Sequence, residues 1–512
     1  MKPLLRMITH RITIVAFAML LQLGILITVL IRFNRYFSSF YAIMVVFSAF
    51  VVIYIVNSKS NPAYKLAWII PILIIPVFGG FFYYLFGNNT LSHKKKLAMQ
   101  SVVTKSIDNA RVHPDVSLML EKDHPHASAQ SKYIEKYSFC SPCAHTRSQY
   151  FSLGEHFFDA LKQDLAQAND YIFMEYFIIE PGIMWDSILS ILCERIQAGV
   201  KVRLIYDDIG CLMTLPKGYA AYLESLGIEI AIFNPLKLMM SSKYNTRDHR
   251  KITVIDGYIG YTGGCNLADE YINRIEKHGH WKDSAVRLEG DAVWHLAVMF
   301  LSLWDFIHGI DEDYTPFQPH ATRQNDLEMT QGIVQPFTDN PLDDEPVGAS
   351  IYLNMIYKAQ EYVYIKTPYL IIDNEMFMAL SIAAKSGIDV RIITPGVADK
   401  WYVHATTRSY YQMLIENGVK IYEYTPGFIH EKVVVADGQF AVIGTINLDY
   451  RSLYLHFECG VWLYQTPSVV DMQHDFEALL LSCQEITRDA CSRIPGHVRL
   501  LRALLRFFAP LM

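Results

Sequence analysis

The chain has 512 residues, more than one ordinary domain needs. Its 45 basic and 51 acidic side chains leave a formal net charge of −6, which argues against a protein that coats nucleic acid through bulk positive charge. Hydrophobic residues make up 52% of the chain and are concentrated in residues 1–90, so we expect a membrane-associated segment ahead of a globular part.

Three apolar runs within the first 90 residues predict a membrane anchor. They cover residues 12–31, 37–56 and 66–86, and about 20 residues is the length that crosses the hydrocarbon core. The first run resembles a signal peptide but lacks a small-residue cleavage site, so we expect it to be retained. The basic segment 93–96 predicts that the rest of the chain is cytoplasmic. Basic residues at the N-terminus oppose three spans, so two and three spans both stay open.

Residues 91–145 are polar and irregular, and we interpret them as a linker. Eight cysteines in the whole chain are typical of a protein in a reducing compartment. Cys140 and Cys143 form a C-x-x-C, but no second pair stands at zinc spacing, so we interpret them as a structural or an accidental pair.

From about residue 146 the chain alternates strand-like and helix-like segments and then repeats itself. Three pairs of segments match: 168–179 with 359–370, 198–205 with 386–393, and 226–230 with 417–421. We therefore predict an α/β fold built of two duplicated sandwich domains, 146–325 and 326–512, with pseudo-twofold symmetry. Two similar halves usually pack face to face and can build one site across their interface.

The same short motif stands at matching points of the two halves. The first copy holds His249, Lys251 and Asp256, and the second holds His430, Lys432 and Asp437, each spaced H-x-K-x₄-D-G. The residues between lysine and aspartate are mostly β-branched and apolar, which predicts a buried strand on which histidine and lysine share a face. If the halves pack about a twofold axis, two histidines and two lysines converge on one pocket.

This constellation suits a phosphodiester. The lysines supply positive charge for the non-bridging oxygens, while one histidine can attack phosphorus and the other can protonate the leaving alcohol. The aspartates are expected to fix the motif's turn rather than to touch substrate. No carboxylate-rich cluster suited to magnesium or calcium is visible in the sequence, so we predict neither a metal nor a cofactor.

Four polar residues downstream of the motifs complete the candidate site. Asn266 and Asn447 each follow a glycine-containing turn, which predicts amide donors to the substrate phosphate. Asp283 and Glu458 stand further along, and each is a candidate to hold a ring nitrogen of one histidine.

These motifs resemble those of the phospholipase D superfamily, which is defined by paired HKD motifs. The resemblance covers nearly the whole chain from about residue 150. Within the superfamily the closer resemblance is to bacterial cardiolipin synthases, carried by residues 61–80, 247–251, 262–266, 269–271, 367–369 and 444–452. Two positions depart from that pattern: Thr445 stands where serine is usual, and His456 stands where asparagine is common.

The resemblance implies that two phosphatidylglycerol molecules become cardiolipin and glycerol through a phosphohistidine intermediate. It implies His249 as the nucleophile and His430 as the general acid and later the general base. We then expect Asp283 to orient His249 and Glu458 to orient His430. The expected partners are phosphatidylglycerol and anionic lipids of a bacterial cell membrane, with no nucleic acid.

Other readings remain open at this point. A phospholipase D-type hydrolase or another phosphatidyltransferase would differ only in the nucleophile that resolves the intermediate. Near-neutral charge and the apolar runs disfavour a nuclease, and the intact motifs disfavour an inactive membrane scaffold. At the C-terminus, residues 498–508 alternate arginine with apolar residues, which predicts an amphipathic helix that either lies on a membrane or packs on the core.

Overall fold

The computed structural model describes residues 24, 27–28, 37–58, 61–87, 103–109, 114–236, 246–319, 330–341 and 345–511. The chain divides into an N-terminal unit, which contains residues 1–92, and a catalytic unit, which contains residues 93–233 and 247–509.

The N-terminal unit contains four helical elements. They are α3 (Phe37–Asn57), α4 (Pro62–Ile74), α5 (Pro76–Phe82) and the π-helix η2 (Tyr83–Gly87). In the described part of the chain, Ser39–Asn57 within α3 is the one segment long and apolar enough to cross a membrane, which agrees with the predicted run 37–56. The predicted run 12–31 lies almost wholly outside the described residues.

The predicted run 66–86 is not one continuous helix. Helix α4 ends at Ile74, and Ile75 takes a non-helical conformation with φ −128° and ψ 70°. The cause is Pro76, whose ring disfavours the helical conformation of the residue before it. The broken segment folds back on α3, where Ser48 Oγ donates a hydrogen bond to the Pro76 carbonyl at 2.6 Å.

The predicted irregular linker 91–145 was partly wrong, because it contains α7 (Pro114–Asp123) and α8 (Pro125–Ser138). Most of the side chains that α8 buries are polar, among them Ser128, Gln130 and Ser131. Gln130 Nε2 donates to the Ile351 carbonyl at 3.1 Å. A helix that binds its neighbours through polar side chains shows no apolar period in the sequence.

The first half of the catalytic unit is built on a seven-stranded sheet of order β1-β8-β6-β5-β2-β3-β4. The strands are β1 (Thr146–Phe151), β2 (Tyr171–Tyr176), β3 (Lys201–Asp207), β4 (Glu229–Phe233), β5 (Ile252–Ile255), β6 (Ile259–Gly263) and β8 (Ala285–Gly290). Strands β2, β3 and β4 are parallel, and the other pairs are antiparallel. The helices are α9 (Gly154–Leu165), α10 (Ile183–Gln197), α11 (Tyr219–Ser225) and α12 (Val293–His308), with a 3₁₀ turn η4 (Asp269–Ile272).

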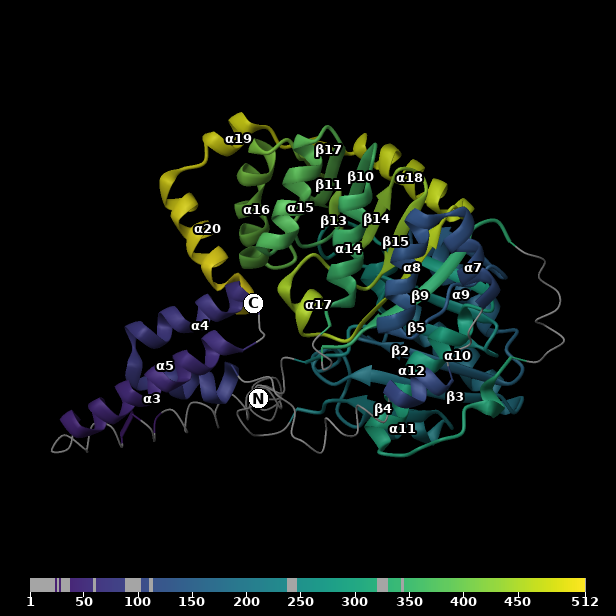
Figure 1. Cartoon of the computed structure of the whole chain (residues 1–512). Coiled ribbons are helices and arrows are strands. Elements are labelled where there is room, and N and C mark those ends of the chain that lie inside the picture. The colour runs from purple at the N-terminus through teal and green to yellow at the C-terminus, as the bar shows by residue number, and fades with distance from the viewer. Residues whose placement is uncertain are drawn as a thin grey trace. The chain divides into compact units, whose positions relative to one another are not determined.

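The second half repeats this arrangement in an eight-stranded sheet of order β17-β12-β11-β10-β14-β15-β16-β9. The strands are β9 (Ile333–Asp339), β10 (Tyr362–Lys366), β11 (Asp389–Pro395), β12 (Lys420–Tyr424), β14 (Val433–Ala436), β15 (Phe440–Gly444), β16 (Glu458–Tyr464) and β17 (Cys483–Glu485). The helices are α14 (Val347–Lys358), α15 (Asn374–Lys385), α16 (Trp401–Glu416), α17 (Tyr450–Tyr454), α18 (Pro467–Leu480), α19 (Arg488–Ser492) and α20 (Gly496–Phe508) (Figure 1). Read from its β9 edge, this sheet has the same order as the first sheet plus one edge strand, which confirms the predicted duplication. The predicted boundary at residue 325 lies outside the described residues.

The two sheets share one apolar core. Helix α12 is buried along almost its whole length, because it is apolar all round. The same core cluster takes Ile252 and Val254 from the first sheet and Val433 and Val435 from the second. The two motif-bearing strands, β5 and β14, are therefore anchored in one core between the halves.

Candidate active site

Each motif places its histidine and lysine just before a central strand. Residues 249–251 precede β5 and residues 430–432 precede β14, so the polar part of the motif lies at the strand's start rather than within it. All four side chains are buried. Lys251 Nζ donates to the His249 carbonyl at 2.5 Å, and Lys432 Nζ makes the same bond to the His430 carbonyl. The lysines thus help to fix the backbone that carries the histidines.

The backbone of each motif is hydrogen-bonded to the opposite half. His249 N donates to the Phe457 carbonyl at 2.9 Å, and Phe457 N donates back to the Arg247 carbonyl at 2.8 Å. His430 N donates to the Lys282 carbonyl at 2.7 Å, where β13 (Gly427–Ile429) pairs with β7 (His280–Lys282) in parallel. The two halves interlock at the motifs, so the motifs form one site.

The same interlocking brings a carboxylate from the opposite half to each histidine. His249 Nδ1 lies 2.9 and 3.0 Å from the two carboxylate oxygens of Glu458. His430 Nδ1 lies 2.7 Å from Asp283 Oδ2. The predicted partnership was therefore wrong, since each acid orients the histidine of the other half. With Nδ1–H bound to a carboxylate, Nε2 is left to act on substrate.

Burial and nearby positive charges disfavour protonation of both imidazoles. Burial, followed by the charge of Lys251, lowers the pKa of His249 well below its usual value. Lys432 and His430 also lower that pKa, which shows that both motifs lie within electrostatic reach of one another. Burial and Lys432 lower the pKa of His430 to about 4, although Asp283 opposes the shift. A neutral imidazole has the lone pair that attack on phosphorus requires.

The lysines are held in surroundings that favour an anionic ligand. Burial lowers the pKa of Lys251 to about 8 and that of Lys432 to about 7. An anionic phosphodiester placed between them would oppose these shifts, because an opposite charge favours the protonated amine. The same negative charge would favour a proton on one of the histidines.

The motif aspartates hold turns, as the sequence predicted. Asp256 accepts hydrogen bonds from the backbone N–H groups of residues 169–171, and Asp437 accepts them from residues 360–362. Both aspartates have φ of 53°, a left-handed conformation that Asp tolerates better than most residues. Their carboxylates tie each motif to the start of the neighbouring strand.

The two asparagines differ in what they can still bind. Asn266 Oδ1 accepts from Ile178 N at 3.0 Å, and its Nδ2 donates to the Tyr271 hydroxyl at 2.7 Å. Asn266 thus supports the fold, and substrate contact through its second amide N–H stays a prediction. In the described residues, the buried Asn447 Oδ1 has no hydrogen-bond partner, so substrate contact stays a prediction for Asn447.

Two matching turn positions support the carboxylates in different ways. Thr445 Oγ1 donates to Glu458 Oε2. At the matching position of the first half, a Cβ on Gly264 would lie 1.9 Å from Asp283 Oδ1, so a side chain there would displace the carboxylate. Thr445, which stands where serine is usual in the family, thus supplies the hydroxyl that holds Glu458, the carboxylate partner of His249.

Sequence reasoning missed a pair of buried ion networks behind the motifs. In the first motif, Arg250 Nε lies 2.6 Å from Glu175 and 3.3 Å from Asp248. In the second motif, Glu431 lies between Lys366 and Lys282, the latter at 2.7 Å. The repeat contained a signal for these networks, namely charged residues of opposite sign at matching positions. Glu175 matches Lys366 and Arg250 matches Glu431, so each charge has the opposite sign in the other half.

We expect Arg250→Ala to lower the free energy of unfolding by about 3–5 kcal/mol, because it leaves buried carboxylates without their cation. The control is Arg147→Ala, whose side chain is exposed and 4.0 Å from Glu289. That change is expected to cost about 0.5 kcal/mol or less. Thermal unfolding of the detergent-solubilised protein measures both. Equal melting temperatures for the two variants would contradict a structural role for the Arg250 network.

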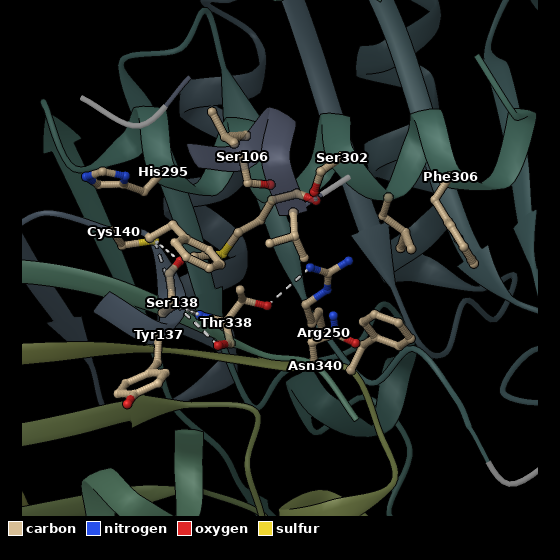
Figure 2. Close-up of a pocket in the computed structure, with 16 residues that line it drawn as sticks. Ser106, Tyr137, Ser138, Cys140, Arg250, His295, Ser302, Phe306, Thr338 and Asn340 are labelled. Atoms are coloured by element: carbon tan, nitrogen blue, oxygen red, sulfur yellow. Dashed lines mark hydrogen bonds between the residues drawn. The ribbon is translucent and has the colours of Figure 1, made fainter. Parts of the chain in front are cut away.

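A cavity of about 60 Å³ lies behind the first motif, and its lining includes neither motif histidine nor motif lysine. Figure 2 shows Arg250 and Thr338 at this cavity, with Ser302 and Phe306 of α12. Arg250 NH1 lies 3.5 Å from Thr338 Oγ1. This cavity therefore adjoins the supporting network and not the histidine Nε2 atoms.

Among the described residues, His249, His456 and Glu458 form one grouping with metal-ligand atoms within 4.8 Å of one another. The geometry suits catalysis better than a metal, because Glu458 already binds His249 Nδ1. We expect EDTA to leave activity largely intact, because Glu458 and not a metal holds His249 Nδ1. Strict loss with EDTA, restored by one divalent ion, would contradict this expectation.

Comparison with known proteins adds independent findings. Residues 161–304 and 352–480 match the family model described as cardiolipin synthase, PLD-like domain. Residues 43–88 match the phospholipase D-nuclease N-terminal family. The two halves of the first match contain the two motifs, and the second match covers residues 43–57 of α3 together with α4 and α5.

Two relatives and one solved structure illustrate the similarity. An uncharacterized protein of Streptococcus mutans is 40% identical over 465 residues, covering 90% of this chain and 99% of the relative. A cardiolipin synthase of Halalkalibacterium halodurans is 32% identical over 511 residues, covering 98% of this chain and 100% of the relative. The crystal structure of a phosphatidylserine synthase from Haemophilus influenzae is 13% identical with a TM-score of 0.56, covering 74% of this chain and 97% of that one. At that identity the likeness shows the fold alone.

Proposed function

We propose that this chain, which belongs to the family of cardiolipin synthases with a phospholipase D-like domain, transfers a phosphatidyl group from one phosphatidylglycerol to another and releases glycerol. One observation carries the proposal: two buried histidines, each held at Nδ1 by a carboxylate of the opposite half. That arrangement supplies one nucleophile and one proton carrier to a single phosphodiester.

The first half-reaction forms a covalent intermediate. His249 Nε2 attacks phosphorus, the bond between phosphorus and the glycerol oxygen breaks, and His430 gives its proton to that oxygen. Lys251 and Lys432 balance the negative charge on the non-bridging oxygens. Glycerol leaves, and the phosphatidyl group remains on His249.

The second half-reaction reverses these roles on a new acceptor. His430, now unprotonated, takes the proton from a glycerol hydroxyl of a second phosphatidylglycerol. That oxygen attacks phosphorus, the phosphorus–nitrogen bond breaks, and cardiolipin forms while His249 is regenerated. The free Asn447 Oδ1 can accept a hydrogen bond from a glycerol hydroxyl, which fits a hydroxyl-bearing acceptor.

We infer that the protein works in a bacterial cell membrane, as a multi-pass protein with its catalytic unit on the cytoplasmic side. Helix α3 is long and apolar enough to span the bilayer. The basic residues 93–96, which follow the N-terminal apolar segments, favour that orientation. A lipid substrate also suits a protein bound to the bilayer.

Incubation of the reconstituted protein with phosphatidylglycerol, labelled in the headgroup glycerol or in the acyl chains, tests the proposal. Lipid separation is expected to show label in cardiolipin, with one glycerol released per cardiolipin formed. Phosphatidic acid as the main product would instead identify a hydrolase, in which water resolves the intermediate. Absence of any turnover would favour a catalytically inactive protein.

A further inference from the structure

The C-terminal helix α20 (Gly496–Phe508) has its polar side turned toward the protein and its apolar side turned away. It packs along α16 (Trp401–Glu416) (Figure 1). Arg506 NH1 lies 2.7 Å from Met413 Sδ, and its guanidinium lies 5.9 Å from the Tyr410 ring centre. Arg502 is half-buried, which places this second arginine on the inner side as well.

The outer side of α20 is apolar and is exposed in the part of the chain that the structure describes. Exposed fractions are 63% for Leu500, 43% for Leu501, 53% for Leu504 and 43% for Phe508. At 100° per residue these four side chains share one side of the helix. No residue of α20 is buried. A helix that packed as part of the core would turn this side, and not the arginine side, toward α16.

The charge of the surrounding segment indicates what covers the apolar side. Between residues 487 and 511 the sequence contains five arginines and one acidic residue, although the whole chain has a net charge of −6. Arg488, Arg493 and Arg499 are exposed. Exposed leucines beside exposed arginines are the pattern of a helix that lies in an anionic lipid interface.

We propose that α20 docks the catalytic unit on an anionic lipid surface, with Leu500, Leu501, Leu504 and Phe508 inserted among the lipids. The proposal rests on the proposed function, because it brings the two-histidine site to the surface that contains its substrate. Such docking would hold the catalytic unit against the membrane surface, where the local concentration of phosphatidylglycerol is high. The N-terminal anchor alone would tether the unit without fixing it to that surface.

Photo-crosslinking tests the contact without requiring turnover. The full chain carries p-benzoylphenylalanine in place of Leu504, or in place of the exposed Tyr222 on α11 as the control. It is reconstituted into vesicles of phosphatidylcholine with or without phosphatidylglycerol. We expect a lipid adduct at position 504 that exceeds the adduct at position 222, and an increase of about threefold or more when phosphatidylglycerol is present.

Other crosslinking outcomes would overturn the proposal. A yield at position 504 no larger than at position 222, or no rise with phosphatidylglycerol, excludes an anionic lipid surface as the occupant. Crosslinking of position 504 to a second copy of the chain would assign the apolar side to a protein interface instead.

Kinetics provide an independent readout. The double variant Leu501→Glu, Leu504→Glu is expected to turn over phosphatidylglycerol in bilayers about tenfold more slowly, with unchanged turnover of a short-chain monomeric phosphatidylglycerol. The control Leu481→Glu, at a 91% exposed leucine after α18, is expected to match the unmodified protein on both substrates. An equal loss on both substrates would overturn docking. Absence of turnover by the unmodified protein would refute the proposed function and leave the crosslinking result standing.

Discussion

Alanine at His249 or at His430 is expected to lower the rate of cardiolipin formation by about 10³-fold or more. His249→Ala removes the nitrogen that bonds to phosphorus. His430→Ala removes the group that protonates glycerol on departure and accepts a proton from the second phosphatidylglycerol. Each loss is expected to be nearly complete, because the lysines and the remaining histidine can bind the phosphodiester but cannot replace the missing step. Lipid separation after incubation with labelled phosphatidylglycerol measures the rate.

The controls separate catalysis from folding. His156→Ala changes an exposed histidine on α9 and is expected to leave the rate unchanged. Circular dichroism and melting temperature of the two active-site variants are expected to stay near those of the unmodified protein, because each ring lies at the site and not in the apolar core. Turnover near the unmodified rate in either active-site variant would refute the two-histidine mechanism.

Much of the fold and the core of the site could be predicted because the sequence repeats. The matching segments gave two halves of one topology, and two copies of H-x-K-x₄-D-G gave the histidines, lysines and turn aspartates. The turn role of Asp256 followed from its position before a glycine, which is a local property. Local rules also identified α3, where a long apolar run forms one helix.

The partnership of acid and histidine could not be predicted by such rules. Asp283 follows His249 along the chain and Glu458 follows His430, so pairing within each half was the simpler expectation. The structure crosses the pairs, because Phe457 binds the first motif's backbone while Lys282 binds that of the second. A repeat read along one chain cannot distinguish pairing within a half from pairing between halves.

Two other features of the site depend on contacts that the periodicity of the sequence does not reveal. Asn266 accepts a hydrogen bond from Ile178 N and donates one to the Tyr271 hydroxyl, so its side chain also holds the fold together. The reversed charges of Arg250 and Glu431 make sense only once their partners from neighbouring strands are known. Both cases depend on tertiary contacts of buried polar groups.

The corrected pairs also bear on which histidine attacks. Asp283 opposes the effect of burial on the pKa of His430, which remains at about 4. Burial and the nearby Lys251 lower the pKa of His249 well below its usual value. We therefore propose His249 as the nucleophile and His430 as the proton carrier, because Asp283 favours the protonated form of His430.

The expected result is a phosphorylated His249 that accumulates in the His430→Ala variant when the leaving group is good. With a phosphatidyl ester of p-nitrophenol, departure needs no proton, so His249 is still expected to attack and release one p-nitrophenol per site in a burst. The second step lacks its base, so the intermediate persists and peptide mass spectrometry locates the label. His249→Ala is expected to show neither burst nor label.

The two carboxylates provide matched variants. Glu458→Gln is expected to slow labelling of His249, whereas Asp283→Asn is expected to slow the release of glycerol and to leave the release of p-nitrophenol unchanged. Label on His430 in the His249→Ala variant would reverse the assignment.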